Sequence, residues 1–258
     1  DKNIFKGYSL IQRYNCQGCH IVDGFGGQIA DIIGAPEYSP PNLNTQGLKT
    51  QPDWLFSFFK HPSVIRPNLQ VRMPSFTMFS DDDWNSIITA FQHMENHNLS
   101  FESEFTFSDK STKYLAGEKV HEFGACNNCH FYGEIKPIQD PSTWAPNLAL
   151  TKERLRPDWV VEWLRDPQKI MPGTKMPAPY LPTSDLLQAD GAIDIWGKYL
   201  IEIDGDNDLM LEGLRDYIYN IPGKIDISDF VKNYFKNNGY EFHSPEEDEE
   251  EDWDDEEW

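Results

Sequence analysis

The four cysteines of this chain form two pairs, and each pair is followed at once by a histidine. The first motif reads Cys16-Gln17-Gly18-Cys19-His20 and the second reads Cys126-Asn127-Asn128-Cys129-His130. On one helical turn, positions i, i+3 and i+4 share a face, so two thiols and an imidazole can point at one ligand. This spacing is typical of covalent attachment of a c-type haem, in which the sulfurs form thioethers with vinyl groups and the imidazole reaches the iron.

The alternatives to haem attachment at these motifs are a redox dithiol, a zinc site and chance. A redox dithiol needs no histidine at this position and is expected in a β-α-β context that the sequence lacks. A zinc site could use both pairs, but it would leave the histidine after each second cysteine unexplained. Since two such motifs use every cysteine of the chain, we predict two covalently bound haems c, each containing iron.

Further landmarks recur around the two motifs, which indicates an internal duplication. They are Pro-Asn-Leu at 41–43 and 146–148, Pro-Asp-Trp at 52–54 and 157–159, and Met-Pro at 73–74 and 176–177. The duplication predicts two tandem domains, residues 1–100 around the first haem and residues 101–205 around the second. A helical extension at 206–245 and an acidic tail at 246–258 are expected to follow.

Hydrophobic periodicity indicates helices throughout, so the predicted fold class is all-α with a haem in each core. Helices are expected at 7–15 and 113–124 before the motifs, at 53–60 and 158–165 after a proline, and at 81–95. Residues 183–203 are expected to be the counterpart of the helix at 81–95. The extension is expected to form one helix that carries Leu209, Leu211, Leu214, Tyr217 and Ile218, and another at 227–237 introduced by Asp226. No alternating pattern predicts a strand.

Charge is distributed unevenly along the chain. The 258 residues hold 22 Lys+Arg against 43 Asp+Glu, a net charge of −21. Residues 1–100 contribute −2, residues 101–205 contribute −5 and residues 206–258 contribute −14. This excess of carboxylates argues against a nucleic-acid partner. No apolar run approaches the roughly 20 residues of a membrane-spanning helix, so no transmembrane segment is expected in this chain.

The acidic tail concentrates this charge. Residues 246–258 hold 11 acidic side chains and two tryptophans. One interpretation is a solvated segment without fixed structure. A second is a docking peptide, whose carboxylates steer toward a basic surface while Trp253 and Trp258 act as anchors. A third is a tail that buffers metal ions.

The order of these features resembles the class I cytochromes c in a tandem dihaem form. The resemblance is carried by the Cys-x-x-Cys-His motifs, the Pro-Asn-Leu turn, a tryptophan-bearing helix, the segment Met171-Pro172-Gly173-Thr174-Lys175-Met176-Pro177 and a closing helix with Tyr199-Leu200. It covers about residues 4–97 and 112–203. The nearest likeness is to the soluble haem domains found beside quinol-oxidising and terminal oxidase complexes.

The resemblance implies the remaining axial ligand of each iron. In the family pattern this ligand is a methionine just before a proline, and Met73 and Met176 match that pattern. Met78 and Met171 are the nearby alternatives, and any methionine can also be a filler of the core. A thioether ligand raises the reduction potential relative to bis-histidine ligation.

The resemblance also implies partners for the two haem histidines. The backbone carbonyls of Pro41 and Pro146 would accept hydrogen bonds from His20 and His130. Neighbours of the haem edges or propionates would include Trp54, Trp144 and Trp159, each of which can also be ordinary aromatic core. We expect His61, His93, His97 and His243 to be solvated. His121, on the helix before the second motif, is expected to be a buried residue that packs this helix against its neighbours. The alternative is a site that binds a proton as part of the function.

Three functions are compatible with this pattern. The leading one is an electron carrier between redox protein partners, not an enzyme, located in the periplasm or elsewhere outside the cytoplasm, where haem c is attached. The second gives the same role to a bound subunit of a membrane respiratory or photosynthetic complex. The third is a dihaem enzyme such as a peroxidase, which would need an iron with an open site and a distal histidine or arginine that the sequence does not suggest.

Overall fold

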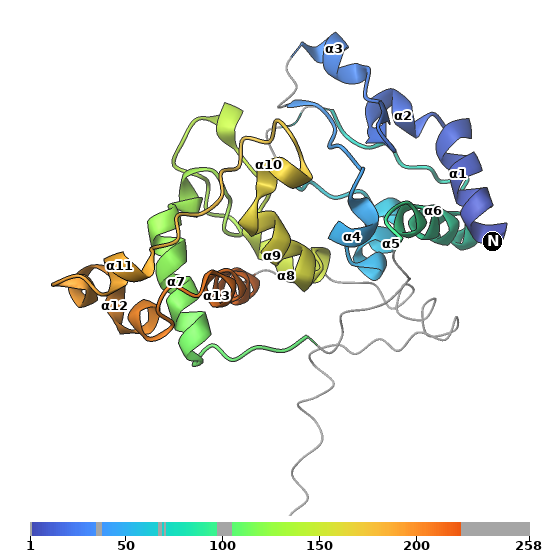
Figure 1. The fold of residues 1–258 in the computed structure, drawn as a ribbon. Helices are drawn as coiled ribbons and strands as arrows, with labels where there is room; N and C mark the ends of the chain where they lie inside the picture. The colour runs from blue at the N-terminus through green and yellow to red at the C-terminus, as the bar shows by residue number, and fades with distance from the viewer. Residues whose placement is uncertain (1, 35–37, 67–68, 70, 97–104, 223–258) are drawn as a thin grey trace, which may run out of the picture.

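The structure is a computed structural model, and it describes residues 2–34, 38–66, 69, 71–96 and 105–222. The described chain is mainly helical, as predicted, and its two halves (residues 2–96 and 105–222) lie side by side (Figure 1). The expected helix at 227–237, the acidic tail and the histidines at 97 and 243 lie outside the described residues. No helix among the described residues is long and apolar enough to cross a bilayer.

The first half holds six helices and a small ribbon within its described residues. The helices are α1 (Lys2–Arg13), α2 (Cys16–Cys19), α3 (Ile29–Ile33), α4 (Gln46–Lys49), α5 (Pro52–Lys60) and α6 (Asp81–Met94). The strands β1 (Ile21–Val22) and β2 (Phe25–Gly26) pair antiparallel, with Val22 opposite Phe25. This short ribbon was not predicted, because two residues are too few to show an alternating pattern.

Local sequence explains where the main helices of this half begin. Pro52 stands in the first turn of α5, where its missing N–H costs nothing. The Ser80 side chain accepts a bond from the N–H of Asp83, and the Asp83 carboxylate accepts one from the N–H of Ser80. This capping box starts α6 at the three aspartates that the sequence placed at its N-terminus.

The second half repeats this order with additions. Its elements are α7 (Thr112–Gly124), the 3-10 turns η2 (Cys126–Asn128), η3 (Pro141–Thr143) and η4 (Leu148–Leu150), and the helices α8 (Thr151–Arg154), α9 (Pro157–Arg165), α10 (Pro167–Ile170), α11 (Ser184–Leu187), α12 (Ala192–Glu202) and α13 (Asn207–Tyr219). The predicted helices at 113–124 and 158–165 correspond to α7 and α9.

Each half is closed by a helix crossing at a glycine. A Cβ on Gly7 of α1 would overlap the backbone carbonyl of Ser86 on α6. In the second half, a Cβ on Gly117 of α7 would overlap the backbone of Gly213 on α13. Backbones can approach this closely only where a residue has no side chain, so the glycines determine which helices cross.

The prediction that residues 183–203 form the counterpart of the helix at 81–95 was therefore wrong. Residues 183–203 form two helices, α11 and α12, and Gly197 breaks α12 with a φ of 75°. The helix that packs on α7 as α6 packs on α1 is α13, which the sequence placed in an extension beyond residue 205. The segment 183–205 is an insertion before this helix, and α12 packs on α7 (Figure 1).

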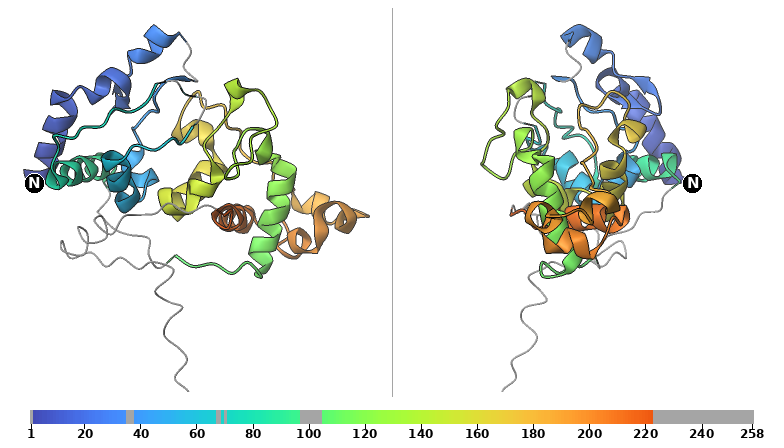
Figure 2. Two further views of the ribbon diagram at one scale, coloured as in Figure 1. Left: turned by 180° about the vertical axis from the view of Figure 1, so that it is seen from behind. Right: turned by 60° about the vertical axis from the view of Figure 1, so that its left-hand side comes forward.

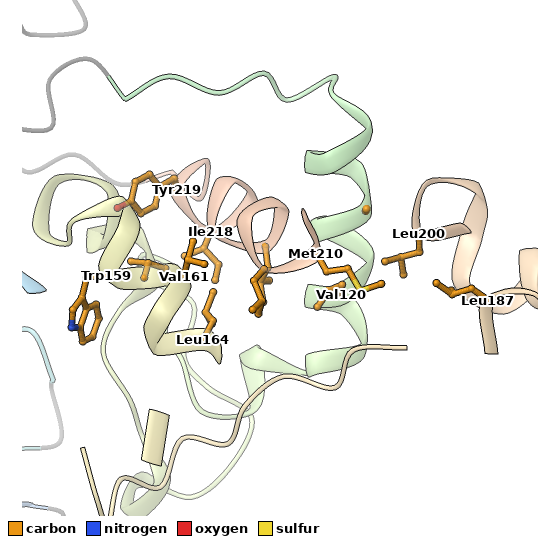
Figure 3. Close-up of a cluster of buried hydrophobic side chains, with 13 residues drawn as sticks. Val120, Trp159, Val161, Leu164, Leu187, Leu200, Met210, Ile218 and Tyr219 are labelled. Atoms are coloured by element: carbon orange, nitrogen blue, oxygen red, sulfur yellow. The ribbon is translucent and has the colours of Figure 1, made fainter. Parts of the chain in front are cut away.

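Two apolar clusters form the cores of the halves. The first gathers side chains of α1, α5 and α6 around Phe56, which is fully buried. The second runs from Trp159 on α9 through α13 and α7 to Leu187 and Leu200 of the insertion (Figure 3). Met210 and Val120 lie where α13 meets α7, so α13 belongs to this core rather than to an appendage.

The two halves meet where α4 and α5 of the first half lie beside α8 and α9 of the second (Figure 2). Thr50 and Leu155 pair as an antiparallel bridge at its centre. The flanking backbone bonds run from Gln51 N–H to the Arg154 carbonyl (2.9 Å) and from Arg156 N–H to the Lys49 carbonyl (3.0 Å). The two donors, Gln51 and Arg156, each stand one residue before the proline of a Pro-Asp-Trp landmark. The two acceptors, Lys49 and Arg154, each stand three residues before it. Equivalent residues of the two halves therefore make equivalent bonds to each other, as in a symmetric dimer.

We predict that Gly117→Ala destabilises the protein by about 1–3 kcal/mol, although alanine is the better helix former, because its methyl group must push α13 away from α7. Thermal unfolding of the haem-loaded protein measures the loss. The control is Glu118→Ala, on the exposed face of the same helix, which should change stability by less than about 0.5 kcal/mol. Equal stability of the two variants would contradict the crossing at Gly117.

Candidate haem-attachment sites

The first cysteine motif forms a single tight turn. Asn15 precedes it in the left-handed region with a φ of 51°, which turns the chain from α1 into α2. The His20 N–H then donates to the Cys16 carbonyl at 2.9 Å, so the histidine lies directly after the turn that carries both thiols. Both thiols are half-buried and free, as thioether formation requires.

The second motif repeats this geometry with other residues. Ala125 takes the left-handed conformation, with a φ of 46°, and the turn itself is the 3-10 helix η2. The His130 N–H donates to the Cys126 carbonyl at 2.9 Å. A non-glycine residue in this region is unusual and an alanine more so, so the surrounding structure must impose the turn.

Each histidine donates its Nδ1–H to a proline carbonyl. The Nδ1-to-oxygen distance is 2.7 Å from His20 to Pro41 and 2.7 Å from His130 to Pro146. These bonds confirm the partners implied by the family resemblance. A carbonyl can only accept, so Nδ1 carries the proton, and burial lowers the pKa of both imidazoles and keeps them neutral. Each ring therefore leaves Nε2 with a free lone pair for a metal.

An asparagine holds each carbonyl-bearing turn, a role that the sequence analysis missed. Asn42 accepts from the N–H of Asn44 at 2.8 Å, and Asn147 accepts from the N–H of Ala149 at 3.1 Å. Asn147 also exchanges two bonds with Gly133, at 2.9 and 2.8 Å. The Pro-Asn-Leu repeat was the available signal, since an asparagine after a proline is a frequent turn residue.

The methionines differ in their surroundings. Met73 is half-buried and packs on the first apolar cluster, whereas its neighbour Met78 is 65% exposed. Met176 is half-buried against the second cluster. Its sulfur accepts a hydrogen bond from the indole N–H of Trp163, with 2.8 Å between nitrogen and sulfur. Met171, the other alternative, is also half-buried.

Three cations gather at the boundary between the halves. The Lys49 ammonium lies 5.4 Å from the Trp159 ring centre, and the Arg154 guanidinium lies 5.4 Å from the Trp54 ring centre, so each half places a cation on the other's tryptophan. Burial, with repulsion from Arg154 and Arg66, lowers the pKa of Lys49 to about 7. Burial and repulsion from Arg66 likewise lower the pKa of Arg154 to about 10.

This boundary also holds polar atoms that need a partner. Within the described residues, the donors Arg154 Nε and Trp159 Nε1 and the acceptors Asp53 Oδ1 and Glu153 Oε2 are buried without a hydrogen-bond partner. A buried donor left unpaired is costly, and the cost is larger beside a buried positive charge. A haem carries two propionate carboxylates, which could accept from Arg154 Nε and Trp159 Nε1, so these two donors fit the cofactor that the cysteine motifs predict.

The remaining sequence candidates lie as follows. His61 and His93 are exposed, as expected. The Trp144 indole donates to the Gln139 carbonyl at 2.9 Å and meets Phe131 edge to face. His121 is half-buried, bonds to the Tyr132 hydroxyl and packs on the Tyr217 ring with centres 4.7 Å apart. These ring contacts agree with the expected packing role.

The two cysteine pairs do not come together. No group of three or more His, Cys, Asp or Glu side chains arranged to hold a metal ion occurs among residues 2–34, 38–66, 69, 71–96 and 105–222. The zinc site that would use both pairs is therefore not formed. Each pair instead has its own histidine and its own proline carbonyl.

A helical chain with a Cys-x-x-Cys-His turn and a carbonyl-anchored histidine has the attributes of a cytochrome c. Residues 3–89 match the family model described as cytochrome c oxidase, cbb3-type, subunit III. The match supports a cytochrome c, with covalently bound haem c and haem-based electron transfer, over the first third of the chain. No curated protein and no solved structure matches the chain.

We predict that His121 makes the protein sensitive to acid. Burial lowers the pKa of His121 to about 4, against about 6.5 in an unfolded chain. The unfolded state therefore binds the proton first, and stability falls as the pH drops from about 6.5 to 4. Because the ring is partly exposed, we expect a loss on the order of 1–2 kcal/mol.

Unfolding of the haem-loaded protein at pH 7 and pH 4.5 measures this loss. His121→Phe keeps the ring packing and should lose less stability over this interval than the unsubstituted protein. His61→Gln, at an exposed histidine, should behave like the unsubstituted protein. An undiminished acid loss in His121→Phe would show that another group is responsible.

Proposed function

We propose that this chain is a dihaem c-type cytochrome that transfers electrons between redox partners. The proposed attachment and ligand residues are Cys16, Cys19, His20 and Met73 for the first haem, and Cys126, Cys129, His130 and Met176 for the second. The observation that carries the proposal is the duplicated hydrogen bond from histidine Nδ1 to a proline carbonyl, at 2.7 Å in both halves.

The protein's part in this function is attachment, orientation and exclusion of water. When bound, each haem supplies a one-electron couple at its iron. The thiols anchor the porphyrin, and the neutral imidazoles of His20 and His130 offer Nε2 to the iron in a fixed orientation. Met73 and Met176, half-buried against the two apolar clusters, are the thioethers proposed to complete the coordination.

The second haem rests on repeated geometry, because the family match ends at residue 89. The residues at 125–130 repeat the left-handed turn, the histidine-to-cysteine backbone bond and the carbonyl contact of residues 15–20. The glycine crossing of α7 with α13 repeats that of α1 with α6. We therefore place the second cytochrome unit from about residue 105 to the end of α13 rather than to residue 205.

The boundary between the halves is the proposed site for propionate carboxylates. Lys49, Arg66 and Arg154 are half-buried there and repel one another, and Arg154 Nε and Trp159 Nε1 have no acceptor among the described residues. A carboxylate would relieve both the repulsion and the missing acceptors. Since each half lays a cation on the other's tryptophan, one boundary would serve both cofactors.

The second candidate function is the same electron transfer within a membrane respiratory complex. It is favoured by the family model, whose description names an oxidase subunit. The acidic tail would then serve to dock a basic surface. Both candidates place the protein outside the cytoplasm, in the periplasm or at a membrane surface, because haem c is attached there.

We predict two haems per chain, each with a sulfur ligand. The oxidised protein should show the sulfur-to-iron charge-transfer band, and Met73→Ala and Met176→Ala should each remove about half of it. Met78→Ala, at an exposed methionine five positions from Met73, is the matched control and should leave the band intact. A haem content of one per chain would disprove the dihaem proposal, and rapid peroxide turnover would favour an enzyme.

We predict that Lys49→Met and Arg154→Met each lower the midpoint potentials of both haems. The oxidised iron carries one more positive charge than the reduced iron, so removing a nearby cation stabilises the oxidised form. Spectroelectrochemical titration measures the shift. Lys152→Met, which removes an exposed charge from the same segment, should change the potentials much less. Equal shifts in all three variants would place the propionates elsewhere.

A further inference from the structure

The indole of Trp163 makes a direct contact with a proposed iron ligand. Its Nε1–H donates to the Met176 sulfur, with 2.8 Å between the two atoms. The indole is held in place by its neighbour Trp159, with ring centres 5.1 Å apart and planes at 14°. Both tryptophans lie on α9, so the donor is positioned by a helix of the core rather than by a loop.

The first half has the same stack without the donor. Trp54 and Phe58 lie on α5 at the positions equivalent to Trp159 and Trp163, with ring centres 5.1 Å apart and planes at 16°. The two halves therefore have the same stacking geometry, but the first half has the phenyl ring of Phe58 where the second half has the indole of Trp163. A phenyl ring has no N–H to donate, so Phe58 cannot give Met73 the bond that Met176 receives.

This difference bears on the potential of each centre. A thioether sulfur has two lone pairs, so it can bind iron with one and accept the indole N–H with the other. The hydrogen bond withdraws electron density from the sulfur and weakens its donation to iron. Ferric iron depends on that donation more than ferrous iron does, so the bond favours the reduced state.

We propose that Trp163 raises the reduction potential of the second haem above that of the first, and so directs electrons from the first half to the second. This inference rests on the proposed dihaem function. The step is a one-electron transfer in which the iron served by Met73 is oxidised and the iron served by Met176 is reduced, with no proton moved. Trp163 acts through the methionine and is therefore a positioning residue.

The expected size follows from the strength of one hydrogen bond. A net contribution near the upper end for a neutral bond changes an equilibrium constant about tenfold. For a one-electron couple, a tenfold change corresponds to about 59 mV. Electrons should therefore favour the second haem over the first by up to about tenfold from this bond alone.

The test is a redox titration of the haem-loaded protein and of Trp163→Phe, which installs the residue found at the equivalent position of the first half. We expect the higher of the two midpoint potentials to fall and the lower one to stay, so that the gap narrows. Trp196→Phe is the matched control, since this tryptophan lies on α12, where its ring packs on Phe123 and Tyr180, and it should leave the gap unchanged.

Two further readouts keep the outcome decisive. In the reduced protein, the indole proton of Trp163, identified by its absence in Trp163→Phe, should exchange with solvent more slowly than that of Trp196. An unchanged gap, or a freely exchanging Trp163 proton, would overturn the proposal. Loss of the sulfur-to-iron band in Trp163→Phe would also overturn it, because the indole would then hold the ligand in place rather than tune it.

Failure of the inference can be distinguished from failure of the proposed function. A protein with one haem, or without sulfur ligation, contradicts the function itself. A protein with two sulfur-ligated haems whose potentials do not respond to Trp163→Phe retains the function and contradicts only the role of Trp163.

Discussion

The hydrogen bond from histidine Nδ1 to a proline carbonyl is the interaction on which both candidate sites depend. It selects one tautomer and leaves the Nε2 lone pair of each ring available to a metal. The left-handed residue before each motif, the turn through the cysteines and the asparagine that braces the Pro-Asn-Leu segment all serve to bring these two groups together. The helix crossings at Gly7 and Gly117 then hold the α1 and α7 ends of each motif against the rest of the half. In each half, the packing of the helices therefore supports the hydrogen bond between the histidine and the proline carbonyl.

Between the halves, the duplicated sequence produces a self-complementary boundary. Equivalent residues exchange equivalent backbone bonds about Thr50 and Leu155, as they do in a symmetric dimer. The same arrangement brings Lys49 and Arg154 together at a half-buried place, where they repel each other in a chain whose net charge is −21. The propionates proposed to bind there would relieve this repulsion, which the contacts of the protein itself leave in place.

Much of this could be predicted from the sequence, because the relevant signals are local. A cysteine motif is contained in one turn, and Pro52 and Pro157 mark helix starts within a few residues. The closing helix of the second half could not be identified in this way. Residues 183–203 are as apolar as a closing helix should be, and only the tertiary contact of Gly117 with Gly213 selects α13 instead. The buried cations were missed for the same reason, since Lys49 and Arg154 are ordinary charged residues until the fold places them together.

The positions at which the two halves differ are the most informative about how the two candidate sites differ. Their turns, carbonyl contacts and aromatic stacks agree closely, so a difference inside that shared frame is not a by-product of a different fold. One difference is the insertion of α11 and α12, which adds Leu187 and Leu200 to the second core. The other is the exchange of Phe58 for Trp163, which alters one atom's contact with one sulfur. Two equal centres would share an electron equally, and a chain that passes electrons in one direction needs unequal ones. A polar contact at the proposed ligand would change the potential without disturbing packing, because indole and phenyl occupy the same stacked position.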